Sequence, residues 1–177
     1  MRIGPCTVAD AAGASTRRQR FATTFAGTSR VASPSARIGF TGLKAHPGAG
    51  TRLTAPTDVV LSRHDVIEPD LLFVAADQTG VVTDATLQGA PALVVEVLSP
   101  STRKHDAQTK RQLFARSGVR EYWLVDPELD AVQVYRRQDD GTFVRVAELS
   151  AEDDHALTTP LLPGWSLGLR ELFREGM

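Results

Sequence analysis

The chain of 177 residues lacks most of the features that mark specialised classes of protein. Its single cysteine, Cys6, excludes an intrachain disulfide framework and a zinc site made of cysteines alone. No apolar stretch reaches ten residues, and the first ten residues lack the apolar run of a secretory signal, so neither a membrane span nor secretion is expected. The formal net charge of −1 gives no global bias toward nucleic acid. A single domain in the reducing cytoplasm is therefore the expectation.

Acidic side chains are almost absent from the first 50 residues. This segment carries seven Lys and Arg against one acid, Asp10, and the first glutamate of the chain is Glu68. Ala, Gly, Ser and Thr fill 27 of the 50 positions, which leaves little apolar surface to offset the entropy cost of ordering the segment. An Arg- and Ser-rich, acid-poor segment could also be an organellar transit peptide. We predict a disordered basic segment over residues 1–50 and a globular domain over residues 51–177.

The rest of the chain alternates between short apolar runs and turn residues, which predicts a sheet with one principal helix. Leu71–Ala76 and Ala92–Leu98 are typical of buried strands. A helix is predicted from a cap at Ser101 or Thr102 to about Ser117, ended by Gly118. Further strands are predicted over Glu121–Val125, Ala131–Arg137 and Thr142–Glu148, the last two as a hairpin, with a short helix within Leu167–Phe173. This order indicates an α/β or α+β fold.

Glu96 interrupts one of the predicted buried strands. Strand alternation puts it on the same face as Val94 and Leu98. If both faces of the strand are covered, an ionised carboxylate there costs several kcal/mol unless a cation or hydrogen-bond donors meet it. Glu96 is therefore either a residue that faces solvent or an arginine, or a metal-ligating or catalytic carboxylate.

Asp70 stands at the entrance of the other buried strand. Pro69 disfavours a helix at Glu68, so the chain enters the strand in an extended conformation. An aspartate in this place is commonly a turn former. It becomes a candidate metal ligand because its strand could lie beside the one that carries Glu96.

Lys110 lies within the predicted core-facing arc of the helix, with Leu113 and Phe114. A lysine there must either extend to solvent or meet an anion. One interpretation is an ordinary ion pair with Asp106, one turn earlier. The other is that Lys110 reaches over the strand edge toward Glu96.

Two carboxylates and a lysine at the mouth of a strand suit phosphodiester hydrolysis. Mg²⁺ binds carboxylate oxygens, acidifies a bound water and neutralises charge on a phosphoryl oxygen. A nearby lysine can orient the attacking water and stabilise the transition state. The predicted helix and its flanks also carry a basic island, either a solvated helix face or a surface for a phosphate backbone. Its members are Arg103, Lys104, Lys110, Arg111, Arg116 and Arg120, with Asp106 as the one acid.

The motifs around these residues resemble a known family. EPDLLFV and GAPALVVEVLSPSTRKHDAQTKRQLFARSGVREYWLVDP are similar to the Uma2 family of putative restriction endonucleases, in the PD-(D/E)XK nuclease superfamily. The similarity extends over roughly Pro56–Trp165. It implies a restriction-endonuclease-like α/β core with a mixed sheet, in which Asp70 and Glu96 bind Mg²⁺. Leu98 stands where other superfamily members keep their lysine, so the resemblance implies that Lys110 supplies the amine.

The resemblance fails upstream of the domain. The family normally begins with a helix, a strand pair that bears a glutamate, and a second helix, whereas residues 1–50 contain no glutamate. The expectation is a truncated, frame-disrupted or diverged member in which N-terminal core elements are missing.

The function expected from these observations is that of a Mg²⁺-dependent endonuclease acting on DNA phosphodiesters. Asp70, Glu96 and Lys110 would be catalytic, and Arg103, Lys104 and Arg111 would contact the nucleic acid. The alternative is an inactive nucleic-acid-binding or interaction module that keeps the fold. Because nucleases of this fold often pair to cut two strands, the resemblance also allows a homodimer, although the sequence marks no interface.

Overall fold

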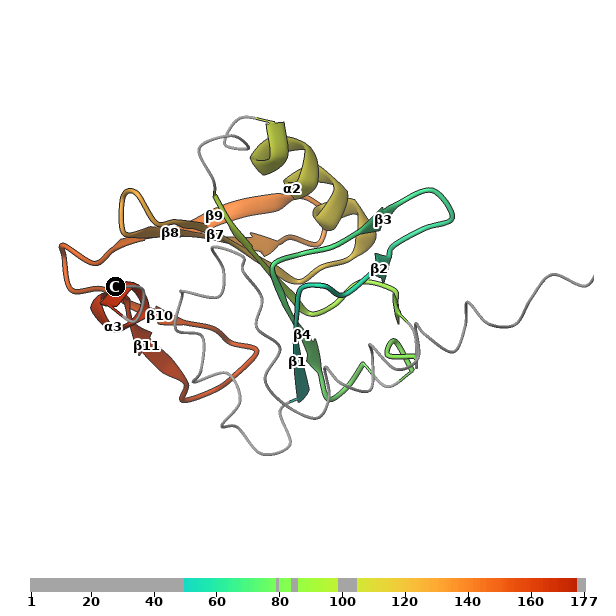
Figure 1. The fold of residues 1–177 in the computed structure, drawn as a ribbon, viewed down its shortest axis with the longest axis horizontal. Helices are drawn as coiled ribbons and strands as arrows, with labels where there is room; N and C mark the ends of the chain where they lie inside the picture. Colours follow the sequence, from blue (N-terminus) through green and yellow to red (C-terminus); the bar gives the residue numbers. More distant parts are fainter. Residues whose placement is uncertain (1–49, 79, 84–85, 99–104, 175–177) are drawn as a thin grey trace, which may run out of the picture. The chain divides into compact units, whose positions relative to one another are not determined.

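A computed structural model describes residues 50–78, 80–83, 86–98 and 105–174 of the chain (Figure 1). The strands are β1 (Gly50–Thr54), β2 (Val59–Val60), β3 (Val66–Ile67), β4 (Leu71–Ala75), β5 (Leu87–Gln88), β6 (Leu93–Val97), β7 (Glu121–Asp126), β8 (Ala131–Arg137), β9 (Phe143–Ser150), β10 (Ala156–Thr158) and β11 (Ser166–Gly168), and the helices are α2 (His105–Ser117) and α3 (Leu169–Arg174). Neither of these two helices has the length and apolar character that crossing a membrane requires. The predicted tail, residues 1–50, lies outside the described residues except for Gly50, as does the predicted cap at Ser101 or Thr102.

Six strands form one mixed sheet in the order β1-β4-β6-β7-β8-β9. Within this sheet, only β6 and β7 pair in parallel, and the chain passes between them through α2, as a parallel pair requires a crossover. The other neighbouring pairs are antiparallel, including the predicted hairpin of β8 and β9. Two smaller sheets, β3-β2-β5 and β10-β11, complete the described strands. This architecture confirms the predicted fold class, a mixed α/β sheet with one principal helix.

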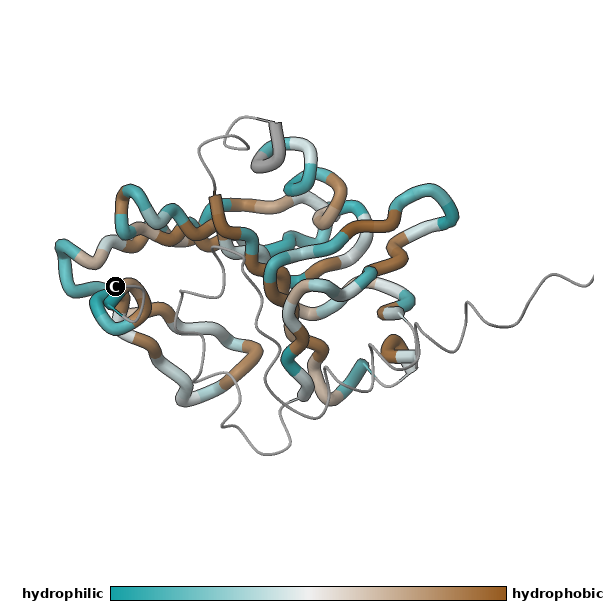
Figure 2. Tube along the Cα trace, in the orientation of Figure 1, coloured by the Kyte–Doolittle hydropathy of each residue, from teal (hydrophilic) through white to brown (hydrophobic). Residues whose placement is uncertain are grey.

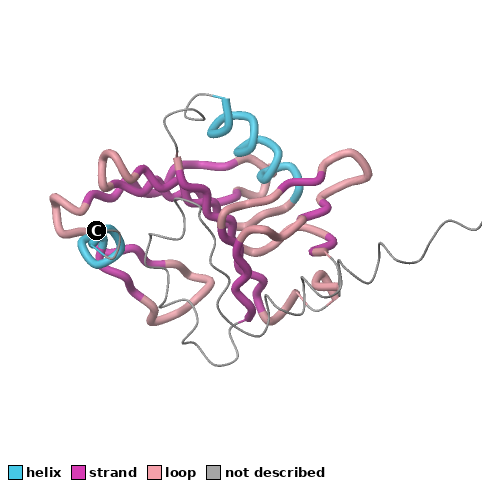
Figure 3. Tube along the Cα trace, viewed as in Figure 1, coloured by secondary structure: helices cyan, strands magenta, loops and turns pink. Residues whose placement is uncertain are grey.

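The two faces of the central sheet bury different sets of side chains, because successive residues of a strand point to opposite faces. On one face, Phe114 of α2 packs with Val94 and Tyr122. On the other face, Trp123 stacks on Trp165 with 5.9 Å between the ring centroids, and the C-terminal elements β10, β11 and α3 close the core. Figures 1 and 3 show α2 and the C-terminal elements on opposite sides of the sheet. Strands β4 and β6 therefore contain apolar runs, drawn brown in Figure 2.

Helix α2 ends as the sequence predicts, at a glycine in the left-handed region. Gly118 has φ of 98°, and its N–H donates to the carbonyl of Ala115 at 3.2 Å. The N–H of Val119 donates to the carbonyl of Phe114 at 3.1 Å, which returns the chain toward β7. Glycine is favoured here because the left-handed conformation brings no Cβ penalty.

We expect Gly118→Ala to lower the free energy of unfolding by about 1–2 kcal/mol, measured by urea denaturation. A Cβ on Gly118 would meet only the Cβ of Ala90, at 4.0 Å, so the cost is conformational rather than steric. Gly168 is the matched control, because it has no positive φ and an added Cβ there has nothing within 4 Å. Equal stability of the two alanine variants would contradict this account of the helix end.

Candidate active site

Asp70 and Glu96 lie on neighbouring strands at one end of the sheet. In the antiparallel pair of β4 and β6, Leu71 is opposite Val95 and Leu72 is opposite Val94. Continuing the register by one residue sets Asp70 opposite Glu96, and residues directly opposite in an antiparallel pair point to the same face. That face is the one that α2 covers, because Val94 shares it with Phe114. The two predicted carboxylates are therefore cross-strand neighbours.

A backbone hydrogen bond fixes the orientation of the Asp70 carboxylate. The N–H of Val97 donates to Asp70 Oδ2 at 2.9 Å. The N–H of Ala55, on the other side of β4, donates to the carbonyl oxygen of Asp70 at 3.1 Å. The Asp70 Oδ1 atom makes no hydrogen bond with the described residues. One carboxylate oxygen is thus committed to holding the side chain, and the other can bind a ligand.

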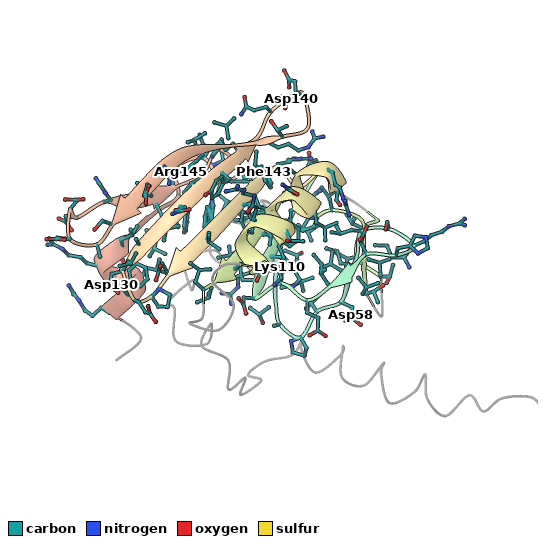
Figure 4. The ribbon with its side chains drawn as sticks, turned by 90° about the horizontal axis from the view of Figure 1, so that it is seen from above. Asp58, Lys110, Asp130, Asp140, Phe143 and Arg145 are labelled. Atoms are coloured by element: carbon teal, nitrogen blue, oxygen red, sulfur yellow. The ribbon has the colours of Figure 1, made fainter. Side chains whose placement is uncertain are left out.

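Glu96 is buried, with 8% of its surface exposed, and it contacts the lysine of α2. Lys110 Nζ donates to Glu96 Oε2 at 3.0 Å, and 27% of the lysine side chain is exposed. Of the two interpretations of Lys110, the structure places its amine at Glu96, whereas the side chain of Asp106 lies outside the described part of the chain. Figure 4 shows Lys110 on α2, above the sheet. The amine supplies the compensating charge that a buried carboxylate requires.

The chemistry of the donor set fits a hard divalent cation. Mg²⁺ takes one or two carboxylates and keeps several water ligands, which matches the pair of Asp70 and Glu96. Within the described ranges, no group of three or more His, Cys, Asp or Glu side chains could hold a metal ion. Among the described residues, Asp70 and Glu96 are therefore the side chains proposed to hold such a cation, with water completing its ligands.

The three residues predicted to contact nucleic acid divide into two groups. Arg103 and Lys104 lie outside the described residues. Arg111 lies on α2 with its guanidinium carbon 4.9 Å from the centroid of the Tyr135 ring, a cation–π contact. The Tyr135 hydroxyl donates to Gln133 Oε1 at 2.7 Å. Arg111 is thus partly buried over β8, while its neighbour Lys110 turns to β6.

Toward the C-terminal end of α2, acids of the protein neutralise part of the positive charge of the basic island. Arg116 forms an ion pair with Asp65, 3.4 Å apart, and Arg120 forms one with Asp77, 2.8 Å apart. The Arg120 contact holds the pKa of the Asp77 carboxyl below its usual range. These two arginines therefore form ion pairs within the domain instead of presenting an uncompensated positive charge to a ligand.

Glu121 is a buried acid that the sequence analysis missed. Only 1% of its surface is exposed. Trp123 Nε1 donates to its Oε1 at 2.7 Å, Thr159 Oγ1 donates to its Oε2 at 2.9 Å, and Arg136 Nε lies 3.5 Å from Oε2. Burial raises the pKa of the Glu121 carboxyl, although these three neighbours act in the opposite direction. Strand alternation could have found it, because it shares a face with Trp123 and Val125.

Comparisons with known proteins agree with this fold. A family model described as Uma2, putative restriction endonuclease, matches residues 40–170. The uncharacterized protein slr1290 of Synechocystis is 40% identical over 55 residues, and this match covers 30% of the chain but only 29% of the length of that relative. A crystal structure of a putative nuclease from Anabaena variabilis superimposes with a TM-score of 0.60 at 15% identity, covering 92% of this chain and 81% of that one. The structural match supports the fold.

Proposed function

The chain belongs to the Uma2 family, and from its site we propose a nuclease that uses a divalent cation, Mg²⁺, to hydrolyse DNA phosphodiester bonds. One observation carries the proposal. Glu96 is buried at the end of β6, beside Asp70 of the next strand and 3.0 Å from the amine of Lys110. A buried carboxylate is costly and a hydrophobic side chain would suit the strand better, so the presence of Glu96 there favours a role in chemistry.

Each side chain of the site has a distinct role in this proposal. Asp70 and Glu96 bind the cation, with Asp70 held in orientation by the Val97 N–H. When bound, the cation supplies an acidified water and neutralises charge on the phosphate. Lys110 lies over Glu96 with about a quarter of its side chain exposed, so its amine can donate to a non-bridging phosphate oxygen or to the attacking water. DNA rather than RNA is proposed from the family, whose description is that of restriction endonucleases.

The experiment is a cleavage assay on supercoiled plasmid with the full chain, at a series of Mg²⁺ concentrations. We expect nicking that EDTA abolishes. Asp70→Asn keeps an oxygen that can accept from the Val97 N–H but removes the charge that attracts the cation. It should therefore raise the Mg²⁺ concentration for half-maximal cleavage by roughly 10-fold or more.

Two outcomes would overturn the proposal. Cleavage that persists in EDTA would exclude a metal-dependent site. A folded wild-type protein that binds DNA without cutting it at any Mg²⁺ concentration would favour the inactive module, for which the absence of a third metal-ligating side chain among the described residues is the supporting observation.

A further inference from the structure

The hairpin of β2 and β3 ends in a tightly bonded turn. The N–H of Leu61 donates to the carbonyl of Asp65 at 2.9 Å, and Ser62 Oγ donates to Asp65 Oδ2 at 2.8 Å. The N–H groups of His64 and Asp65 donate in turn to Ser62 Oγ, at 3.2 and 3.1 Å. In Figure 1 the loop between β2 and β3 extends away from the central sheet. The turn is therefore a projecting element with a defined shape.

Two connections fix this turn relative to the candidate active site. Along the chain, only Glu68 and Pro69 separate the end of β3 from Asp70. Across space, Asp65 forms the 3.4 Å ion pair with Arg116 of α2, the helix that also carries Lys110. Arg116 follows Lys110 by six positions, which corresponds to about 9 Å along the helix axis. The turn is therefore close to the candidate active site both along the chain and in space.

The exposed side chains of the turn suit a polyanion. Arg63 and His64 are both exposed, and neither side chain makes a hydrogen bond or ion pair with the rest of the described chain. In contrast, Lys110, Arg116 and Arg120 are each bound to an acid of the protein. An arginine at the tip of a rigid turn can bind a phosphate without first breaking an internal ion pair.

We infer that the β2–β3 turn is a substrate-binding element, in which Arg63 contacts the phosphate backbone of duplex DNA beside the scissile bond. The inference rests on the proposed function. A two-stranded ribbon fits the major groove of B-DNA. A single-stranded ligand is less well matched, because such ligands are held by exposed aromatic rings and every aromatic side chain among the described residues is buried or half-buried.

The test measures DNA binding without cleavage. The full chain is titrated against a labelled 20-base-pair duplex in EDTA, by fluorescence anisotropy at several salt concentrations. Loss of one phosphate contact reduces the steepness of the plot of log binding constant against log salt concentration by about 0.9. Arg63→Ala should therefore bind the duplex roughly 5- to 10-fold more weakly near 0.1 M salt. Arg63→Lys keeps the positive charge and should retain most of the wild-type affinity. Arg174→Ala, which removes an exposed arginine at the end of α3, is the matched control and should bind as the wild type does.

The result that supports the inference is a smaller slope for Arg63→Ala alone. Wild-type affinity in Arg63→Ala, an equal loss in Arg174→Ala, or preference for a single-stranded oligonucleotide of the same length would overturn it. Failure of the proposed function would give a different result. A protein that binds DNA through Arg63 but never cleaves it in Mg²⁺ would support the turn as a binding element and exclude the nuclease activity.

Discussion

Glu96→Gln is expected to lower the rate of Mg²⁺-dependent DNA cleavage by about 100-fold or more, equivalent to about 2.7 kcal/mol of transition-state stabilisation. Glutamine nearly preserves the shape of the side chain, and its amide oxygen can still accept from Lys110 Nζ, which lies 3.0 Å from Glu96 Oε2. What the variant loses is the negative charge that binds a divalent cation. The rate should fall while the fold remains.

The measurement is single-turnover nicking of supercoiled plasmid at saturating Mg²⁺, with a thermal melt of each variant to confirm folding. Glu148→Gln is the matched control. Glu148 lies on β9 opposite Gln133, with its side chain 55% exposed, and it pairs with Arg145 at 2.8 Å. Exposed ion pairs contribute little to stability, so this variant should cleave at the wild-type rate. If Glu96→Gln cleaves as fast as Glu148→Gln, Glu96 is not a metal ligand.

The strands that bury long apolar runs were predictable from the sequence. The predicted run Ala131–Arg137 coincides with β8. The runs that became β4 and β7 differ from the structure by one residue at one end, and the run that became β6 is one residue longer at each end. Strands β4, β6 and β7 are covered on both faces, so their buried residues are contiguous and bounded by turn residues. Gly118 was predictable for a similar reason, because few residues other than glycine adopt its φ of 98°.

The short strands were not predictable. Strands β2, β3 and β5 have two residues each, too few for any periodicity to emerge. They exist because Val59 and Leu87 pack together, and this pairing joins residues that are far apart in the sequence. The β2–β3 turn, and with it the exposed position of Arg63, was missed for this reason.

The candidate site was predictable in its residue types but not in its contacts. A glutamate among valines and an aspartate before an apolar run signal buried charge from the sequence alone. Which partner Lys110 takes depends on how α2 lies over β6, and the sequence left both Asp106 and Glu96 open to it. The ion pair of Arg116 with Asp65 similarly joins two residues that are 51 positions apart in the sequence. Such pairings follow from tertiary packing, which the local pattern does not contain.

Glu121→Ala is expected to lower the free energy of unfolding by about 3 kcal/mol, because it leaves buried polar groups without their acceptor. Trp123 Nε1 and Thr159 Oγ1 both donate to the Glu121 carboxylate, and Thr159 belongs to the C-terminal segment that closes one face of the core. Urea denaturation measures the loss. The control is Glu152→Ala, at an exposed position, which should stay within about 0.5 kcal/mol of the wild type. Losses of equal size would show that Glu121 contributes no more than a surface acid.

The stability contributed by Glu121 should also depend on pH, in a direction set by its burial. Burial raises the pKa of this carboxyl above the value of 4.5 expected for an unfolded chain. The protonated form is therefore favoured in the folded protein, and the stabilisation is complete below the unfolded pKa and declines as pH rises through the folded pKa. Glu121→Gln cannot titrate, so the stability advantage of the wild type over this variant should be largest near pH 4 and shrink toward pH 7. Urea denaturation of both proteins across this pH range measures the advantage, because the contributions of the other titrating groups cancel in the difference. An advantage that grew with pH would mean that Trp123, Thr159 and Arg136 lower the pKa of the Glu121 carboxyl by more than burial raises it.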